Sequence, residues 1–381
     1  MLDAQVVSVR VGGRQLVGWR DSTITRSIER LAGTFSVPVS LVPGSEWPCQ
    51  RHDLVEVLLG STVVATGYAL VADPFYSRDD CGFIISGADR TADLVHCSAL
   101  HQGGQWRKAS LSRIAQDLCS PFGIPVKVET DLGELFESYA IWFGETVLEC
   151  LSRAARMRGV LVTRDEEGHV VLTRAGNRRA KTAIRRGANV IRMSPLGSEE
   201  HCHSEYMAYA QGAIGHSFSD ARQIKAMAKD EAVPRYRPLI VPVYGHQTLA
   251  DLQRLVDHTA RVRRGNAWGY KYTVEGWLDG EDSPWPLNAR VVVQDDLARV
   301  DGDGWIISSV TERCDSKDGK VAEVTVKPLA AFSTVQLKDG RHHGVAQGRI
   351  GRDGSRLEPL PPGRGALSPS DGSFAAGVTG G

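Results

Sequence analysis

Alternating apolar and polar residues mark a set of four strands that occurs twice, about 240 residues apart. The first set, which begins near Phe35, predicts strands at 35–42, at 54–59, after Thr62 and at 81–86. The second set, which begins near Tyr270, predicts strands at 270–277, 290–293, 304–310 and 321–326. A turn with a Trp-Pro pair, at 46–48 and at 284–286, follows the first strand of each set. Since successive side chains of a strand point to opposite faces, each set predicts a small β-barrel.

Two shorter elements are expected before the first set. Residues 6–11 and 15–19 alternate around Gly12-Gly13, which is typical of a β-hairpin. Residues 22–32 are interpreted as a short helical turn, with Ile24, Ile28 and Leu31 on one face.

Helical spacing replaces the alternation after about residue 96. Ser110 is expected to cap a helix that ends near 121–123, and a strand is expected at 124–129. Thr146 and Glu149 fit a capping box for a second helix over 145–158, followed by Gly159. A hairpin with strands at 159–163 and 169–173 should follow. This pattern predicts a compact α/β domain inserted after the first barrel.

The segment between this domain and the second barrel is less regular. Residues 177–186 are basic and are interpreted as an exposed connector, with a contact surface for an acidic partner as the alternative. Strands are expected at Val190 and at 204–210, and a long loop or weak helix at 212–235. A helix is expected from Thr248, its N-cap with Asp251 at N3, to Arg264, with Gly265 as its stop.

The predicted fold class is therefore α+β and mainly β, with two related small β-barrel domains, an inserted α/β domain and a flexible C-terminal tail. The expected domains are a first barrel at 1–95, the inserted domain at 96–176, a helix-containing connector region at 177–269, a second barrel core at 270–335 and a tail at 336–381. The tail is rich in Gly, Pro and Ser, and has too few apolar residues to fold alone.

Composition narrows the classes of function. The chain has 45 basic and 45 acidic residues among 381, which argues against general affinity for nucleic acid or anionic membrane. The seven cysteines are scattered and show no Cys-x-x-Cys, so reduced and mostly buried thiols are expected. The first residues lead directly into a strand without the features of a signal peptide, and no stretch reaches the length of a membrane span.

Candidate chemistry is sparse. His201-Cys202-His203 could offer two metal ligands, but zinc needs three or four, and His342-His343 is weaker still. The 301–304 stretch, Asp-Gly-Asp-Gly, lacks the other ligands of a calcium loop and predicts a turn. The sequence holds no nucleophile elbow, Walker A or His-Glu-x-x-His motif. We therefore expect no catalytic, cofactor-binding or metal-binding residue.

Five tryptophans fall in the predicted barrels or beside them, at positions 47, 268, 277, 285 and 305. Tryptophan in such strands and turns usually fills the core, and a sugar-stacking platform is the alternative. Trp285 in particular is expected to close a barrel core.

With the strands placed, three stretches resemble the baseplate hub proteins of Mu-like contractile-tailed bacteriophages, relatives of T4-like tail hubs and of the N-terminal part of type VI secretion spike proteins. One stretch is Ser27-Ile-Glu-Arg-Leu-Ala-Gly-Thr-Phe-Ser36. Another comprises the two helices that begin at Ser110 and Thr146. The last is Val274-Glu-Gly-Trp, Pro284-Trp-Pro and Gly304-Trp-Ile-Ile-Ser-Ser-Val, ending in Val326-Lys-Pro-Leu.

This resemblance implies a homotrimeric ring, with two barrels per chain giving pseudo-sixfold symmetry. The implied partners are the tail tube or baseplate adaptor proteins, the trimeric membrane-piercing spike and the tape-measure protein, without sequence-specific binding of nucleic acid or insertion into a membrane. It implies a structural virion protein rather than an enzyme, made in the bacterial cytoplasm, with no cofactor. The alternatives are a peptidoglycan-binding or wall-degrading tail-associated protein and a type VI-like secretion component. The tail is expected to dock on the spike or on a neighbouring subunit.

Overall fold

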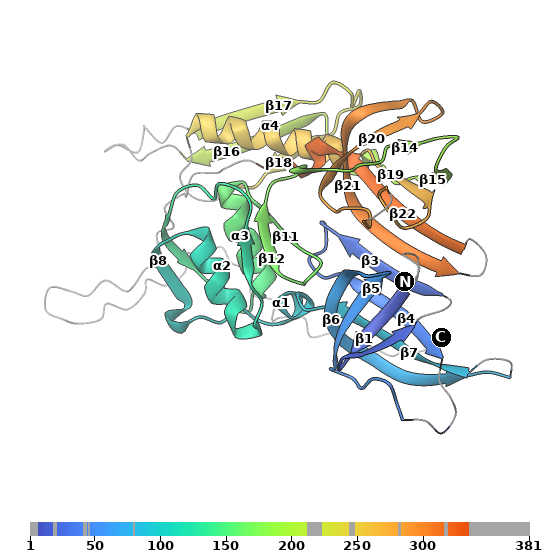
Figure 1. Cartoon of the computed structure of the whole chain (residues 1–381). Coiled ribbons are helices and arrows are strands. Elements are labelled where there is room, and N and C mark those ends of the chain that lie inside the picture. The colour runs from blue at the N-terminus through green and yellow to red at the C-terminus, as the bar shows by residue number, and fades with distance from the viewer. Residues whose placement is uncertain are drawn as a thin grey trace, which may run out of the picture. The chain divides into compact units, whose positions relative to one another are not determined.

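The computed structural model describes residues 7–17, 21–40, 44, 46–78, 81–211, 223–243, 248–280, 283–315 and 319–334 (Figure 1). The predicted tail at 336–381, with His342-His343, lies outside these residues. In the described part of the chain, none of the helices has both the length and the apolar character that a membrane crossing requires.

The first barrel contains the predicted N-terminal hairpin and the four strands of the first set. Its strands are β1 (Val7–Val11), β2 (Arg14–Val17), β3 (Ser22–Ser27), β4 (Thr34–Ser40), β5 (Leu54–Leu59), β6 (Thr62–Tyr76) and β7 (Cys81–Asp89). The helical turn predicted at 22–32 is wrong, because residues 22–27 form strand β3. The three residues expected on one face separate: Ile24 and Ile28 are buried in the core that the barrels share, and Leu31 is buried in the core of the inserted domain.

The second barrel repeats the pairing of the first. Its strands are β15 (Val190–Pro195), β19 (Tyr270–Glu275), β20 (Ala289–Asp295), β21 (Val300–Asp315) and β22 (Gly319–Pro328), with short strands β13 (Arg178–Arg179) and β14 (Ile184–Arg185) beside β20. In the first barrel the strand order is β4-β7-β6-β5, and in the second it is β19-β22-β21-β20. Two related barrels in a mainly β fold are thus confirmed.

A matching bulge aligns the two barrels residue by residue. The pairing of β6 with β7 shifts between Ala69 and Val71, and the pairing of β21 with β22 shifts between Ile307 and Ser309. Ala69 therefore corresponds to Ile307. The Ala69 carbonyl accepts the N–H of His52 at 2.7 Å, and the Ile307 carbonyl accepts that of Asn288 at 3.1 Å. His52 and Asn288 both have positive φ, 73° and 57°, so the loops before β5 and β20 follow the same path.

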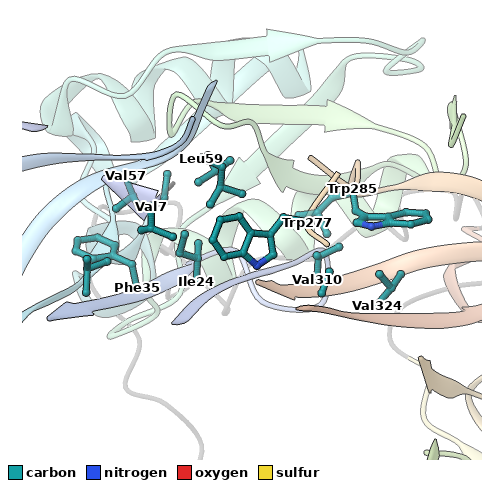
Figure 2. Close-up of a cluster of buried hydrophobic side chains, with 14 of the residues drawn as sticks. Val7, Ile24, Phe35, Val57, Leu59, Trp277, Trp285, Val310 and Val324 are labelled. Carbon is teal, nitrogen blue, oxygen red and sulfur yellow. The ribbon is translucent and has the colours of Figure 1, made fainter. Parts of the chain in front are cut away.

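The strands of the two barrels form one continuous sheet, because β21 pairs with β3. Their side chains accordingly share one hydrophobic core. Figure 2 shows Trp277 in this core, between Leu59 and Ile24 of the first barrel and Trp285 and Val310 of the second.

The inserted domain has its own core and the predicted helices. Its elements are α1 (Ala92–His96), β8 (Gln105–Ala109), α2 (Leu111–Cys119), β9 (Val126–Val128), β10 (Phe136–Ala140), α3 (Val147–Arg158), β11 (Leu161–Arg164) and β12 (Val170–Thr173). Ser110 caps α2, and the Thr146–Glu149 capping box begins α3 as predicted. Gly159 ends α3 in the left-handed conformation (φ 64°).

The rest of the predicted connector region, after β13, β14 and β15, contains a three-stranded sheet with one helix. It contains β16 (Glu205–Gln211), β17 (Gln223–Lys229), β18 (Pro238–Val241) and α4 (Leu249–Asn266), which packs on β16 and β17 (Figure 1). The loop or weak helix predicted at 212–235 is wrong for 223–229, which form a strand. Gly265 does not stop α4. It lies within the helix, where a side chain would collide with the backbone of Ala331.

Candidate functional site: the joint between the barrels

Strand β3 lies against the second half of β21, and this pairing joins the two barrels. The antiparallel register pairs residues 22–27 with residues 309–314. The Ile28 N–H extends the ladder by donating to the Ser308 carbonyl at 2.9 Å. Ile24 is 1% exposed in this arrangement. The joint therefore buries a strand that has few apolar residues of its own.

An ion pair lies buried inside the joint. Arg26 of β3 contacts Glu312 of β21, and the two side chains are 2% and 1% exposed. The guanidinium also donates to the Trp285 carbonyl at 3.0 Å. Removing two charges from water is costly, and their mutual attraction offsets that cost only while both partners are present. The joint is thus sensitive to the loss of either residue.

A second buried ion pair connects the first barrel to the inserted domain. The Arg164 side chain contacts the Asp89 carboxylate at 2.6 Å, and both side chains are almost fully buried. Burial raises the pKa of Asp89, while the Arg164 guanidinium and hydrogen bonds from Thr91 and Gly33 act against that rise. A side chain at Gly33 would overlap the guanidinium, so this close approach requires glycine.

Two aromatic residues of the inserted domain face solvent on a rigid support. Trp142 is 58% exposed and Phe143 is fully exposed. The Glu145 carboxylate accepts hydrogen bonds from the backbone N–H of Trp142 and from the guanidinium of Arg153, both at 2.7 Å. The Arg153 guanidinium lies 4.2 Å from the centre of the Trp142 ring and 4.4 Å from that of Tyr139. The loop is thereby fixed in place and presents apolar area to solvent.

The basic stretch at 177–186 is largely exposed, as predicted for a connector, but it also pairs with the second barrel through β13 and β14. Several of its cations contact acidic groups of the same chain: Arg178–Glu129 (3.2 Å), Arg179–Asp303 (3.5 Å) and Arg186–Asp296 (2.8 Å). These internal contacts weaken the alternative of a dedicated surface for an acidic partner.

The structure does not bring together the metal candidates of the sequence. Cys202 is buried and its thiol donates to the Arg263 carbonyl, while the Nδ1 of His203 lies 3.0 Å from the His201 carbonyl oxygen. Burial lowers the pKa of His203. The 301–304 stretch lies in β21, not in the predicted turn, because its backbone pairs with β20.

One acidic cluster was missed from the sequence. Asp165, Glu167 and His169 place their ligand atoms within 4.8 Å of one another. The Lys127 ammonium contacts the Asp165 carboxylate at 2.5 Å and that of Glu167 at 3.1 Å, so a cation of the chain already lies among these groups. Lys127 comes from a different strand, β9, which sequence spacing could not reveal.

A pocket of about 440 Å³ lies beside the turn of the N-terminal hairpin. Its lining includes the ion pair between Arg10 and Glu56, 2.6 Å apart, and the side chain of Asp53. Two carboxylates and one guanidinium thus line the pocket, and the guanidinium is already paired with Glu56.

The tryptophans divide into two groups. Trp277 and Trp285 are 2% and 1% exposed, which confirms the core prediction, and the partly buried Trp305 packs against the same core. Trp47 and Trp268 are 54% and 48% exposed, so the core prediction is wrong for them. Trp47 makes an edge contact with Phe83 from the surface, with ring centroids 5.5 Å apart.

Two family models match the chain: Mu phage baseplate assembly protein GpP-like, N-terminal, over residues 6–89, and baseplate hub protein gp44-like, second domain, over residues 91–174. The baseplate hub protein gp44 of Escherichia phage Mu is 31% identical over 343 residues, which cover 86% of this chain and 89% of that protein.

Solved structures agree over most of the chain. The 43 kDa tail protein of prophage MuSo2 from Shewanella oneidensis is 31% identical with a TM-score of 0.77, covering 86% of this chain and 99% of that chain. A tail protein from Neisseria meningitidis MC58 shares the fold at 23% identity and a TM-score of 0.74, covering 86% and 98% of the two chains.

Proposed function

The chain belongs to the family of Mu-like phage baseplate hub proteins, and we propose that three copies of it close into a ring at the tip of the tail. The proposed ring adapts a sixfold tail tube to a threefold spike, because each chain contributes two barrels of the same pairing. The role is structural rather than catalytic.

The observation that carries this proposal is the joint between β3 and β21. Each barrel contains the same order of four strands and the same bulge. A heterologous contact that repeats around an axis closes into a ring when its rotation divides a full turn. One such contact already exists inside the chain, so three chains would need three more of a similar kind to arrange six barrels around an axis.

The proposed partners lie on the two faces of this ring. The tail tube or a baseplate adaptor protein would meet one face, and the trimeric spike would meet the other. The tape-measure protein and the DNA would pass along the axis. The chain's balanced charge, 45 basic and 45 acidic residues, favours passage of DNA without capture. Synthesis in the host cytoplasm fits the seven cysteines, of which Cys49, Cys119, Cys150 and Cys202 are buried.

Light scattering on the purified chain tests the ring directly. We expect a molar mass of three chains. A strict monomer at high protein concentration would contradict the proposal, and cell-wall pull-down and zymogram assays would then test the wall-binding alternative.

The tail provides a second test. Deletion of residues 345–381 is expected to leave the three-chain mass unchanged and to weaken attachment of the spike, because the tail has too few apolar residues to fold alone. The measurement is co-purification of the spike with the full-length and truncated rings. Equal recovery of the spike with both would contradict a docking role for the tail.

A further inference from the structure

The internal repeat makes one difference between the barrels conspicuous. Strand β21 pairs with β22 along one edge, and along its other edge with β20 and then with β3. The corresponding strand β6 pairs with β7 along one edge and with β5 along the first half of the other. Among the described residues, no strand pairs with the second half of this β6 edge.

The partner strand shows the complementary difference. Strand β3 lies between β4 and β21, whereas its counterpart β15 pairs with β19 on one side. On its other side Val190 makes an isolated bridge to Arg186, and no described strand pairs with the residues that follow. In the first barrel, the β6 edge that corresponds to the β3-binding edge of β21 is therefore unpaired. In the second barrel, the β15 edge that corresponds to the β21-binding edge of β3 is unpaired after Val190. We call these two the free edges.

Register fixes which residues correspond. Since Ala69 corresponds to Ile307, residues 71–76 of β6 correspond to residues 309–314 of β21. The two ladders likewise match Phe35 of β4 with Tyr270 of β19. The β3 partner of Phe35 is Ile24 and the β15 partner of Tyr270 is Pro195, so residues 193–198 correspond to residues 22–27.

Burial differs between the joint and its free counterparts. Ile24, Arg26 and Glu312 are each 1% exposed in the joint. Their counterparts are Pro195, Gly197 and Pro74, and all three are exposed. The residues of the free edges thus match those of the joint by register, but no described strand covers them.

Exposed apolar residues gather on these free edges. Five large apolar side chains lie there with high exposure: Leu70 (54%), Val71 (40%) and Tyr76 (86%) on β6, and Ile191 (54%) and Leu196 (49%) on or just after β15. Ser308, the counterpart of Leu70, is fully buried. Exposed large apolar side chains on an open strand edge favour this edge as a contact surface for a partner.

The chemistry of the free edges differs from that of the joint. Pro74 replaces Glu312 and Pro195 replaces Ile24, so neither free strand can provide a complete row of N–H donors. Proline on an edge strand prevents indiscriminate pairing with other strands. Apolar side chains rather than a full backbone ladder and a buried ion pair would therefore hold a partner at these edges.

From this we propose that the free edge of β6, residues 70–76, docks on the free edge at residues 193–198, the end of β15 and the residues that follow it, of a second copy of the chain, with Ile191 beside this contact. The contact repeats the β3–β21 joint between chains and alternates with it around the ring. It rests on the proposed trimeric ring and assigns the surfaces that close it.

Charge substitutions on each edge test this assignment. Leu70→Asp with Val71→Asp disables the β6 edge, and Ile191→Asp with Leu196→Asp disables the β15 edge. Each double variant alone is expected to have the mass of one chain by light scattering. Because the contact is heterologous, an equal mixture of the two is expected to form a two-chain complex through the one intact pair of edges. Tyr236→Asp with Leu297→Asp, exposed residues elsewhere, is the matched control and should keep the three-chain mass.

The outcomes separate the two proposals. A three-chain mass for the wild type and for both edge variants would overturn the assigned surfaces while the ring stands. Monomeric edge variants that do not associate when mixed would also overturn the assignment, since the two edges would then not contact each other. A wild-type monomer would overturn the ring and the assigned surfaces together.

A cross-link tests the register. Thr23 faces Arg313 in the joint, which corresponds to Ser194 facing Phe75 of another chain. In a chain carrying Cys81→Ser and Cys97→Ser, oxidation of the Phe75→Cys, Ser194→Cys variant should give a covalent three-chain band on a non-reducing gel. The shifted pair Phe75→Cys, Val190→Cys should not. Equal cross-linking of both pairs would overturn the register.

Discussion

The first barrel places Cys49 where the second places Trp285, although the loops around them follow the same path. Both residues stand three positions before a residue of positive φ, His52 in one loop and Asn288 in the other, and both are 1% exposed. The two barrels therefore share a backbone course while one fills this position with a thiol and the other with an indole. The Trp-Pro pairs of the two loops, at 47–48 and 285–286, are not equivalent positions.

This difference shows which features of the repeat the backbone requires. The bulge in the long strand and the left-handed residue before the second strand occur in both copies, because they bend the sheet and turn the chain. The side chains at matching positions differ in volume and charge. Each copy is thus free to form its own contacts on a common frame.

The largest expected effect concerns this pair of core positions. Trp285→Ala should lower the free energy of unfolding by about 4 kcal/mol, because a large buried indole leaves a cavity. Cys49→Ala should lower it by only about 1 kcal/mol. Urea denaturation of the two variants measures both values. A loss well under about 1 kcal/mol for Trp285→Ala would contradict its burial.

The second largest change in the free energy of unfolding should distinguish Glu312 in the joint from Pro74, its counterpart on the free edge of β6. Glu312→Gln should lower the free energy of unfolding by about 3 kcal/mol, because Arg26 would remain charged, buried and without its carboxylate. Pro74→Glu places a carboxylate at the corresponding exposed position and should change stability by less than about 0.5 kcal/mol. Urea denaturation at low protein concentration, which favours single chains, compares the two variants. Equal losses would mean that burial does not distinguish the two edges.

Substitution of the two residues of positive φ, Asn288 and His52, should change stability to different extents. The Asn288 side chain takes part in a hydrogen-bond network, and the His52 position is exposed. The Asn288 amide accepts the Gly176 N–H at 3.0 Å and donates to the Arg174 carbonyl at 2.9 Å. Asn288→Gly keeps the conformation and loses these bonds, so it should cost about 2 kcal/mol. His52→Gly, at an exposed position, should cost less than about 0.5 kcal/mol. Thermal unfolding of both variants checks the difference, and similar melting temperatures would contradict it.

The smallest expected effect concerns the reactivity of the Cys49 thiol rather than the stability of the protein. Burial, together with the neighbouring Asp53 carboxylate, raises the pKa of Cys49 to about 11. At pH 8 the Cys49 thiol therefore stays protonated and should resist iodoacetamide, whereas the exposed Cys81 and Cys97 react. Peptide mass spectrometry measures the labelling. Labelling of Cys49 as fast as that of Cys81 in the folded protein would contradict its burial.

Local signals in the sequence predicted much of this fold. Alternation located the strands of both barrels, and the capping residues Ser110, Thr146 and Thr248 located the starts of three helices. These signals succeed because each depends on residues a few positions apart. The resemblance to phage hub proteins followed from their order along the chain.

The errors concern partners that are distant in sequence. Ile24 and Ile28 have helical spacing, yet strand β3 forms because β21, far along the chain, supplies its ladder. The merging of the barrels and the burial of Arg26 depend on that same pairing. Strand β17 was missed for a related reason, since its ladder comes from β16. No local pattern distinguishes a surface Trp47 from a core Trp285.

The pairing of β3 with β21 can form only late in synthesis, after β21 has left the ribosome. Arg26 and Glu312 are separated by 286 positions, so Arg26 leaves the ribosome about 15–60 s before its partner at ordinary elongation rates. Throughout that interval the edge of β3 that pairs with β21 is uncovered. Arg26, which is buried in the complete protein, then lacks the carboxylate of Glu312. The N-terminal part of the chain thus completes its fold only when nearly the whole protein has been made. A product truncated before Glu312 would keep this strand edge open, and an open edge is a template for aggregation.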